Sequence, residues 1–306
     1  MGEQTAAYQQ LVTALVGQDP VGRRSETAMP RDRHRTGEGK DNAQMTPDNA
    51  DPAIAGPDDD EQVNRLIEAL GASAQRLAAL VEPLTPDQLR QPAYPSEWTI
   101  ADVLSHLGSG GVITRRRLDG DEVEMQAIWD EWNAKSPDRQ AADALEADRA
   151  FLTRLASLNP EDRVRRFAVG PMDLDLASAL RLRLSEHALH VWDVAVTLDP
   201  TATVPDDAAE LLIDSLGMMA GFAGRPTGVE RTIRVGTLAP PRRLQLELQP
   251  AAVTLSAGGP EGTADLELPA EALIRLIGGR LDPGHTPAVN DPDSNLDELR
   301  RVFPGY

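Results

Sequence analysis

The sequence predicts a mainly α protein that continues into a smaller α+β region, and three observations support this fold class. Between about residues 59 and 200, apolar residues recur at helical spacing, which is typical of a helical bundle. Over residues 203–306, short segments alternate apolar and polar residues between turn residues. Residues 21–58 contain almost no large apolar side chains, and we expect a disordered extension over residues 1–58.

Within the bundle region each helix is indicated by its own pattern. In the segment 58–84, leucines fall on one broad stripe. The second helix begins after Thr99, the expected N-cap, with Asp102 three residues later completing a capping box. Further helices are expected over residues 121–134, 138–157 and 176–197, the last after an interruption in "RRFAVGPMDLDL".

The α+β region is expected to begin with a helix over residues 206–223. Four strands follow, over residues 231–238, 243–250, 252–258 and 263–269. The segment 269–281 reads as a helix that ends in glycines, and 295–303 as a final helix.

The composition argues against several functional classes. A net charge of −19 disfavours binding to nucleic acid or to anionic membranes. The chain has no run of eighteen apolar residues, and its first residues do not form a secretory signal, so we expect a cytoplasmic protein with small-molecule partners. It contains no cysteine, so thiol chemistry would need a thiol from outside. The oligomeric state is left open.

Polar residues stand out in the otherwise apolar stretch "LSEHALHVWDVA", residues 184–195. On a helix, Glu186, His190 and Asp193 lie within about 40° of one another, whereas His187 points roughly 100° away from Glu186. A carboxylate and an imidazole one turn apart can chelate one divalent ion, and Asp193 is then placed to orient an imidazole. A simple Glu–His hydrogen bond or ion pair is the alternative.

His106, in "WTIADVLSHLGSGG", is the candidate third ligand because it lies on another helix of the same bundle. Two histidines and a glutamate form a recognised open zinc site. The glycines at 108, 110 and 111 weaken the helix, which is easier to understand if a ligand or backbone approaches closely there. A core histidine bonded to a carbonyl, and a simple helix kink, are the alternatives.

Together, "SEWTIADVLSHL" and "LSEHALHVWDVA" resemble the mycothiol-dependent maleylpyruvate isomerase family, which belongs to the DinB-like metal-dependent four-helix bundles. The resemblance covers about residues 60–303 and extends to a sterol-carrier-like C-terminal domain. It implies that His106, Glu186 and His190 bind Zn²⁺ or another divalent metal. It also implies that Asp193 is the family's aspartate beside these ligands.

The resemblance further implies mycothiol as the thiol cosubstrate and a small-molecule electrophile as its partner. In an isomerase the thiolate adds to the cis double bond of maleylpyruvate, and rotation and elimination give fumarylpyruvate. A mycothiol S-transferase would stop at the adduct. A metal-dependent hydrolase without thiol, and a non-enzymatic small-molecule or lipid-binding protein, remain as alternatives.

A dianionic substrate needs cationic partners. Arg116 and Arg117, which follow His106 on the same helix, are the candidates for substrate contacts, and a solvated helix face is the alternative for most of this arginine run. The family is also described as using a cationic residue from its C-terminal domain. The candidates considered for this role are Arg225, Arg231, Arg234, Arg242 and Arg243.

Overall fold

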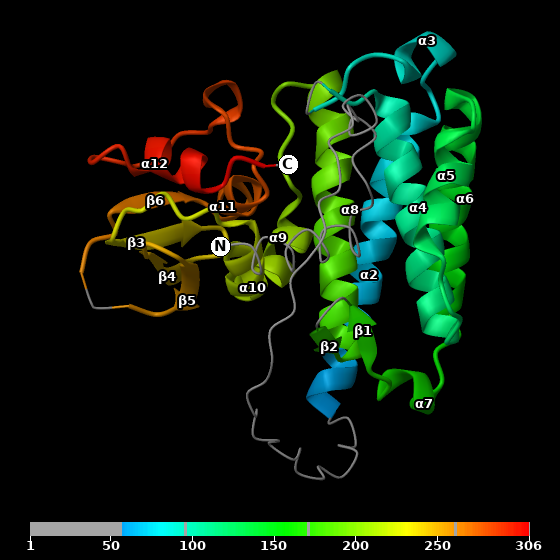
Figure 1. Cartoon of the computed structure of the whole chain (residues 1–306), viewed down its shortest axis with the longest axis horizontal. Coiled ribbons are helices and arrows are strands. Elements are labelled where there is room, and N and C mark those ends of the chain that lie inside the picture. Colours follow the sequence, from blue (N-terminus) through cyan, green and yellow to red (C-terminus); the bar gives the residue numbers. More distant parts are fainter. Residues whose placement is uncertain (1–56, 95–96, 170–171, 260–261, 306) are drawn as a thin grey trace, which may run out of the picture.

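The computed structural model describes residues 57–94, 97–169, 172–259 and 262–305. The expected disordered extension, residues 1–58, lies almost wholly outside these ranges. Four long helices form the bundle in Figure 1: α2 (Pro57–Val81), α4 (Ile100–Asp119), α6 (Pro137–Ala156) and α8 (Leu176–Leu198). Both α2 and α4 pack against α6 and α8, which closes the bundle.

Smaller elements connect the bundle helices. Three short helices are α3 (Pro86–Leu89), α5 (Met125–Asn133) and α7 (Pro160–Arg163). The interruption before α8 is an antiparallel hairpin of β1 (Phe167–Val169) and β2 (Met172–Leu174). These strands are only three residues long, so the sequence pattern shows a break but no strand alternation.

The start of α4 is set locally, as the sequence predicts. Thr99 Oγ1 accepts a hydrogen bond from the Asp102 backbone N–H at 3.1 Å, and Asp102 Oδ2 accepts one from the Thr99 N–H at 2.9 Å. This reciprocal capping box satisfies two backbone donors at the helix N-terminus. Because the first residue of α4 is fixed, His106 is placed two turns into the helix.

The C-terminal region is an α+β layer beside the bundle (Figure 1). Its helices are α9 (Asp206–Leu212), the 3₁₀ turn η2 (Ile213–Ser215), α10 (Leu216–Ala223), α11 (Ala270–Ile277), the 3₁₀ turn η3 (Pro283–His285) and α12 (Asn295–Val302). Its strands are β3 (Arg231–Leu238), β4 (Arg242–Leu248), β5 (Val253–Ala257) and β6 (Leu266–Pro269). They pair in the order β5-β4-β3-β6, and only the β3–β6 pair of this sheet is parallel.

The single helix expected over residues 206–223 is instead broken at η2. The break lets α10 pack closely on β5. A side chain at Gly217 would place its Cβ 2.5 Å from the Leu255 carbonyl oxygen, so glycine is needed for this approach. Local periodicity carries no information on such a contact.

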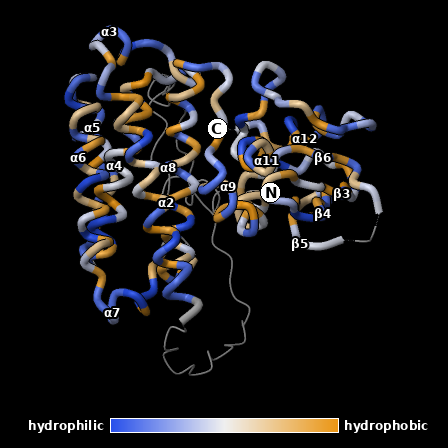
Figure 2. Tube along the Cα trace, turned by 180° about the vertical axis from the view of Figure 1, so that it is seen from behind, coloured by the Kyte–Doolittle hydropathy of each residue, from blue (hydrophilic) through white to orange (hydrophobic). Residues whose placement is uncertain are grey.

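One continuous core joins the bundle to the sheet. The buried face of the sheet, with Ile233 and Val235, lies in the same cluster as Leu184 and Trp192 of α8 and Leu273 of α11. Figure 2 shows apolar residues recurring along the bundle helices and around α9 and α11. The expected class, mainly α with an α+β region, is confirmed. None of the helices in the described ranges has the length and apolar character to cross a lipid bilayer.

Candidate metal centre

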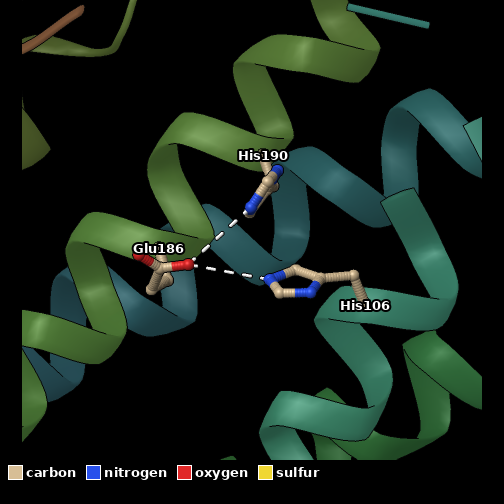
Figure 3. Close-up of side chains that lie close together, drawn as sticks. All are labelled: His106, Glu186 and His190. Carbon is tan, nitrogen blue, oxygen red and sulfur yellow. Dashed lines mark ion pairs between the residues drawn. The ribbon is translucent and has the colours of Figure 1, made fainter. Parts of the chain in front are cut away.

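His106 from α4 and Glu186 and His190 from α8 point toward one another between these two helices (Figure 3). We call these three residues the His–Glu–His cluster. Glu186 Oε2 lies 3.6 Å from His106 Nε2 and 3.7 Å from His190 Nε2. One ligand atom from each residue lies within 4.8 Å of the others. Two segments about eighty residues apart in the sequence thus converge as expected.

The two N···O distances are slightly longer than those around a bound zinc ion. In a tetrahedral zinc site with bonds of about 2.0–2.1 Å, neighbouring ligand atoms are roughly 3.3 Å apart. The side chains of His106, Glu186 and His190 are 9%, 11% and 6% exposed, so the cluster is shielded but not sealed. A simple Glu–His hydrogen bond explains the arrangement less well, because both N···O distances exceed hydrogen-bonding range.

The surroundings keep His106 and Glu186 in the protonation states that a metal requires. Burial and, next in size, the neighbouring His190 together lower the pKa of His106 to about 4. Burial alone would raise the pKa of Glu186, but the two histidines and Arg280 outweigh it, so the pKa lies below its usual range. At neutral pH, His106 is therefore a neutral imidazole beside an ionised carboxylate, which are the metal-ligating forms.

Asp193 orients His190, as the sequence predicts. Its side chain is fully buried, and its Oδ2 lies 2.7 Å from His190 Nδ1. Burial would raise the pKa of Asp193, but Arg280 and His190 lower it below its usual value, so the carboxylate is ionised and only accepts. His190 Nδ1 must then donate, and in the neutral ring Nε2 keeps its lone pair toward Glu186.

Arg280, from the segment after α11, completes this arrangement and was missed by the sequence analysis. Its Nε and Nη2 donate to the two oxygens of Asp193, each at 2.8 Å. The chain turns there at Gly279, whose φ of +71° and contact with Gly305 suit only glycine. The signal in the sequence was Asp193, because an aspartate on a buried helix needs a cation near it and none had been assigned.

The five arginines considered for a cationic role in the C-terminal region lie elsewhere. Arg234 pairs with Asp265, Arg242 pairs with Asp214, and Arg225 donates to the Gly305 carbonyl oxygen. Arg231 and Arg243 are exposed on the sheet. Arg280 is the residue of this region that contacts the cluster, and this corrects the candidate list.

Arg116 and Arg117 are not brought beside the cluster. They follow His106 by ten and eleven residues, which is about 15 Å or more along α4. Arg116 is exposed, and Arg117 Nη2 lies 3.1 Å from Met125 Sδ. Their role in substrate binding stays a prediction.

His187, the residue that points away from the stripe, belongs to a second buried network. Ser73 Oγ lies 2.8 Å from His187 Nδ1, and Asp148 Oδ2 lies 2.9 Å from His187 Nε2. These are the residue types of a hydrolytic triad. All three are at most 5% exposed, and their hydrogen bonds join α2, α6 and α8.

The glycines of α4 make room for neighbouring side chains. A Cβ at Gly108 would overlap the ring of Trp132 and lie 3.0 Å from the Ala144 backbone on α6. A Cβ at Gly110 would lie 2.9 Å from Arg183 Nη1. The expected close approach is therefore real, and Trp132, the α6 backbone and Arg183 make it.

Aromatic rings cover the cluster from the segment before α4. The Trp98 ring is stacked on His190 with an interplanar angle of 6° and a centroid distance of 5.9 Å. It is tilted toward His106 at 5.4 Å. Trp192 instead faces Tyr94 and donates from Nε1 to the Ala202 carbonyl oxygen, so it serves packing.

Comparisons with known proteins agree with this architecture. Residues 70–195 match the model of the mycothiol maleylpyruvate isomerase N-terminal domain. A crystal structure of the mycothiol-dependent maleylpyruvate isomerase is similar in fold, with a TM-score of 0.54 and 10% sequence identity over 72% of this chain and 91% of that one. A histidine-to-alanine mutant of that isomerase matches with the same TM-score and identity over 74% and 95%. The search of curated protein sequences gives no match.

Fold and geometry define the class: a four-helix bundle with a buried His–Glu–His cluster, joined to an α+β region that contributes a cation. Over residues 70–195, the bundle matches the model of the mycothiol maleylpyruvate isomerase N-terminal domain. The resemblance seen in the two sequence motifs is thus confirmed.

Proposed function

We propose that this protein is a zinc-dependent enzyme that uses mycothiol as a cosubstrate on a small electrophile. Its reaction is either isomerisation of a maleylpyruvate-like substrate or transfer of the thiol to the electrophile. The observation that carries this proposal is the convergence of three ligand atoms within 4.8 Å inside a bundle of this family. We name His106, Glu186 and His190 as the ligands.

A divalent ion at this position would lower the pKa of a bound thiol and so favour the nucleophilic thiolate. The residues around it have separate tasks. Asp193 holds the hydrogen of His190 Nδ1, Arg280 holds Asp193, and Trp98 shields the two imidazoles. Because the chain contains no cysteine, the thiol must come from the cosubstrate.

In the isomerisation, the thiolate sulfur forms a bond to one carbon of the cis double bond. The adjacent carbon, stabilised by the conjugated carbonyl group, carries the resulting electron pair. Rotation about the new single bond precedes elimination, which reforms the double bond in the trans geometry and returns the thiolate. In a transfer reaction, the sulfur stays on the electrophile, which gains a proton or loses a leaving group.

The test is turnover by zinc-loaded protein with and without mycothiol. Maleylpyruvate tests isomerisation, and monochlorobimane, a fluorogenic electrophile, tests transfer. We expect thiol-dependent conversion of one of them, lost in Glu186→Gln and retained in His285→Ala, a histidine substitution outside the cluster. Conversion or hydrolysis that is independent of thiol would contradict the proposal and indicate metal-dependent hydrolysis. Lipid that co-purifies with metal-free, inactive protein would indicate a binding protein.

A further inference from the structure

Arg183 is a buried cation one helical turn before Glu186 on α8. Its side chain is 5% exposed and lies against Gly110 and Gly111, which follow His106 by about one turn on α4. The guanidinium therefore lies about one helical turn from the His–Glu–His cluster along both α4 and α8.

The hydrogen-bonding capacity of Arg183 is only partly used. Within the described residues, Nη2 donates to the Leu107 carbonyl oxygen at 3.0 Å and lies 3.5 Å from Asp148 Oδ1. Nε is buried and has no hydrogen-bond partner in that part of the chain. A buried donor without an acceptor is unfavourable, and more so on a charged group. Such a donor in a native structure needs an explanation, such as a bound water or ligand.

The position of Arg183 is nevertheless fixed from every side of the bundle. Gly110 and Gly111 of α4 leave the space that its Nη atoms occupy. Asp148 of α6 faces Nη2 and is itself held by His187, which bonds Ser73 of α2. Burial would raise the pKa of Asp148, but His187 and Arg183 lower it, so the carboxylate is ionised. A rigid scaffold therefore presents a guanidinium with an unused donor.

Arg280, the other buried cation beside the cluster, differs in this respect because it donates from Nε and Nη2 to both oxygens of Asp193. We propose that Arg183 binds a carboxylate of the small-molecule ligand that enters the His–Glu–His cluster. This inference rests on the proposed function in one respect, since it takes the cluster as the place where the ligand binds.

The test is maleate binding, measured by isothermal titration calorimetry on metal-free and on zinc-loaded protein. Maleate is a small cis-dicarboxylate, and maleamide is its uncharged counterpart of similar shape. Arg183→Met should weaken maleate binding by at least about tenfold in both metal states, the usual effect of a lost charge-assisted hydrogen bond. It should leave maleamide binding unchanged. Arg181→Met is the matched control, since Arg181 lies two residues earlier and faces about 200° away.

Three results would overturn the inference. Wild-type protein that does not bind maleate excludes the carboxylate site. An Arg183→Met variant with wild-type maleate affinity shows that Arg183 does not bind the carboxylate and that a water molecule accepts from its guanidinium instead. Equal loss of maleate and maleamide binding shows a structural role only.

Folding is controlled with a second variant. Arg183→Met leaves Asp148 buried without its cation, so Arg183→Met/Asp148→Asn removes both charges. If the single variant does not fold, the folded double variant decides, and wild-type maleate affinity there refutes the inference. The proposed function fails separately, through absent metal binding or absent thiol-dependent turnover, because the maleate measurement in metal-free protein requires neither.

Discussion

Removing Arg280 should destabilise the protein far more than removing an exposed arginine with the same geometry. Arg280→Met leaves Asp193, which is fully buried, with His190 as its one remaining side-chain donor among the described residues. Breaking one side of a buried ion pair costs about 3–5 kcal/mol, because an uncompensated charge stays in the interior. The matched control is Arg242→Met, which breaks a bidentate pair with an aspartate that is 60% exposed. An exposed pair contributes about 1 kcal/mol or less.

The double variant Arg280→Met/Asp193→Asn distinguishes the loss of the ion-pair attraction from the cost of leaving the Asp193 carboxylate buried and unpaired. It contains neither charge, so its loss of stability should be at least about 2 kcal/mol smaller than the sum of the two single losses. Asp193→Asn alone should also weaken zinc binding by about 10- to 100-fold, because His190 loses the carboxylate that orients it.

The assay is urea unfolding of metal-free protein, followed by tryptophan fluorescence and circular dichroism. The four tryptophans all lie in the bundle region, so fluorescence reports on the part that contains the cluster. Coincident transitions by the two probes justify a two-state free energy. Equal losses for Arg280→Met and Arg242→Met, or additive losses in the double variant, would refute the reasoning.

Two further predictions concern the glycines of the bundle and the effect of pH. Gly71→Ala should stabilise the protein by up to about 1 kcal/mol, because a Cβ there meets no atom within 4 Å. Gly108→Ala should destabilise it by about 1–3 kcal/mol, because the new methyl group overlaps Trp132; equal effects in thermal unfolding would contradict both. The pKa of His106 is lowered from 6.5 to about 4, so the unfolded chain binds more protons than the folded chain between these values. Acidifying metal-free protein from pH 7 to pH 5 should therefore cost about 2 kcal/mol of stability through this residue. His106→Asn should flatten that part of the profile, and an unchanged slope would contradict the assignment.

Local signals explain which parts of the fold were predictable. Thr99 and Asp102 are three residues apart, and their capping box depends on little else. The ends of α8 follow similarly from the apolar run and from Asp175, which accepts a hydrogen bond from the Ser178 N–H at 2.7 Å. The break at η2 was not predictable, because it reflects packing of Gly217 on β5.

The same distinction holds in the candidate site. Glu186 and His190 are one turn apart, so their common face follows from helix geometry, and His106 follows from its motif on α4. Arg280 acts on Asp193 across 87 residues and two structural regions, and periodicity does not encode that contact. Arg183 was hidden for another reason. Helix α8 is buried nearly all round, so its pattern does not distinguish a buried arginine from one at the surface.

Zinc content tests the central claim most directly. Tag-free protein would be supplied with zinc, desalted and measured by mass spectrometry as wild type, His106→Ala, His190→Ala and His285→Ala. His285 lies on η3, where its Nδ1 bonds Asp282 at 2.7 Å, so it serves as the matched histidine control. We predict about one zinc per chain in wild type and His285→Ala, and loss in the other two variants. Wild-type protein without zinc, or zinc retained in both cluster variants, would contradict the account.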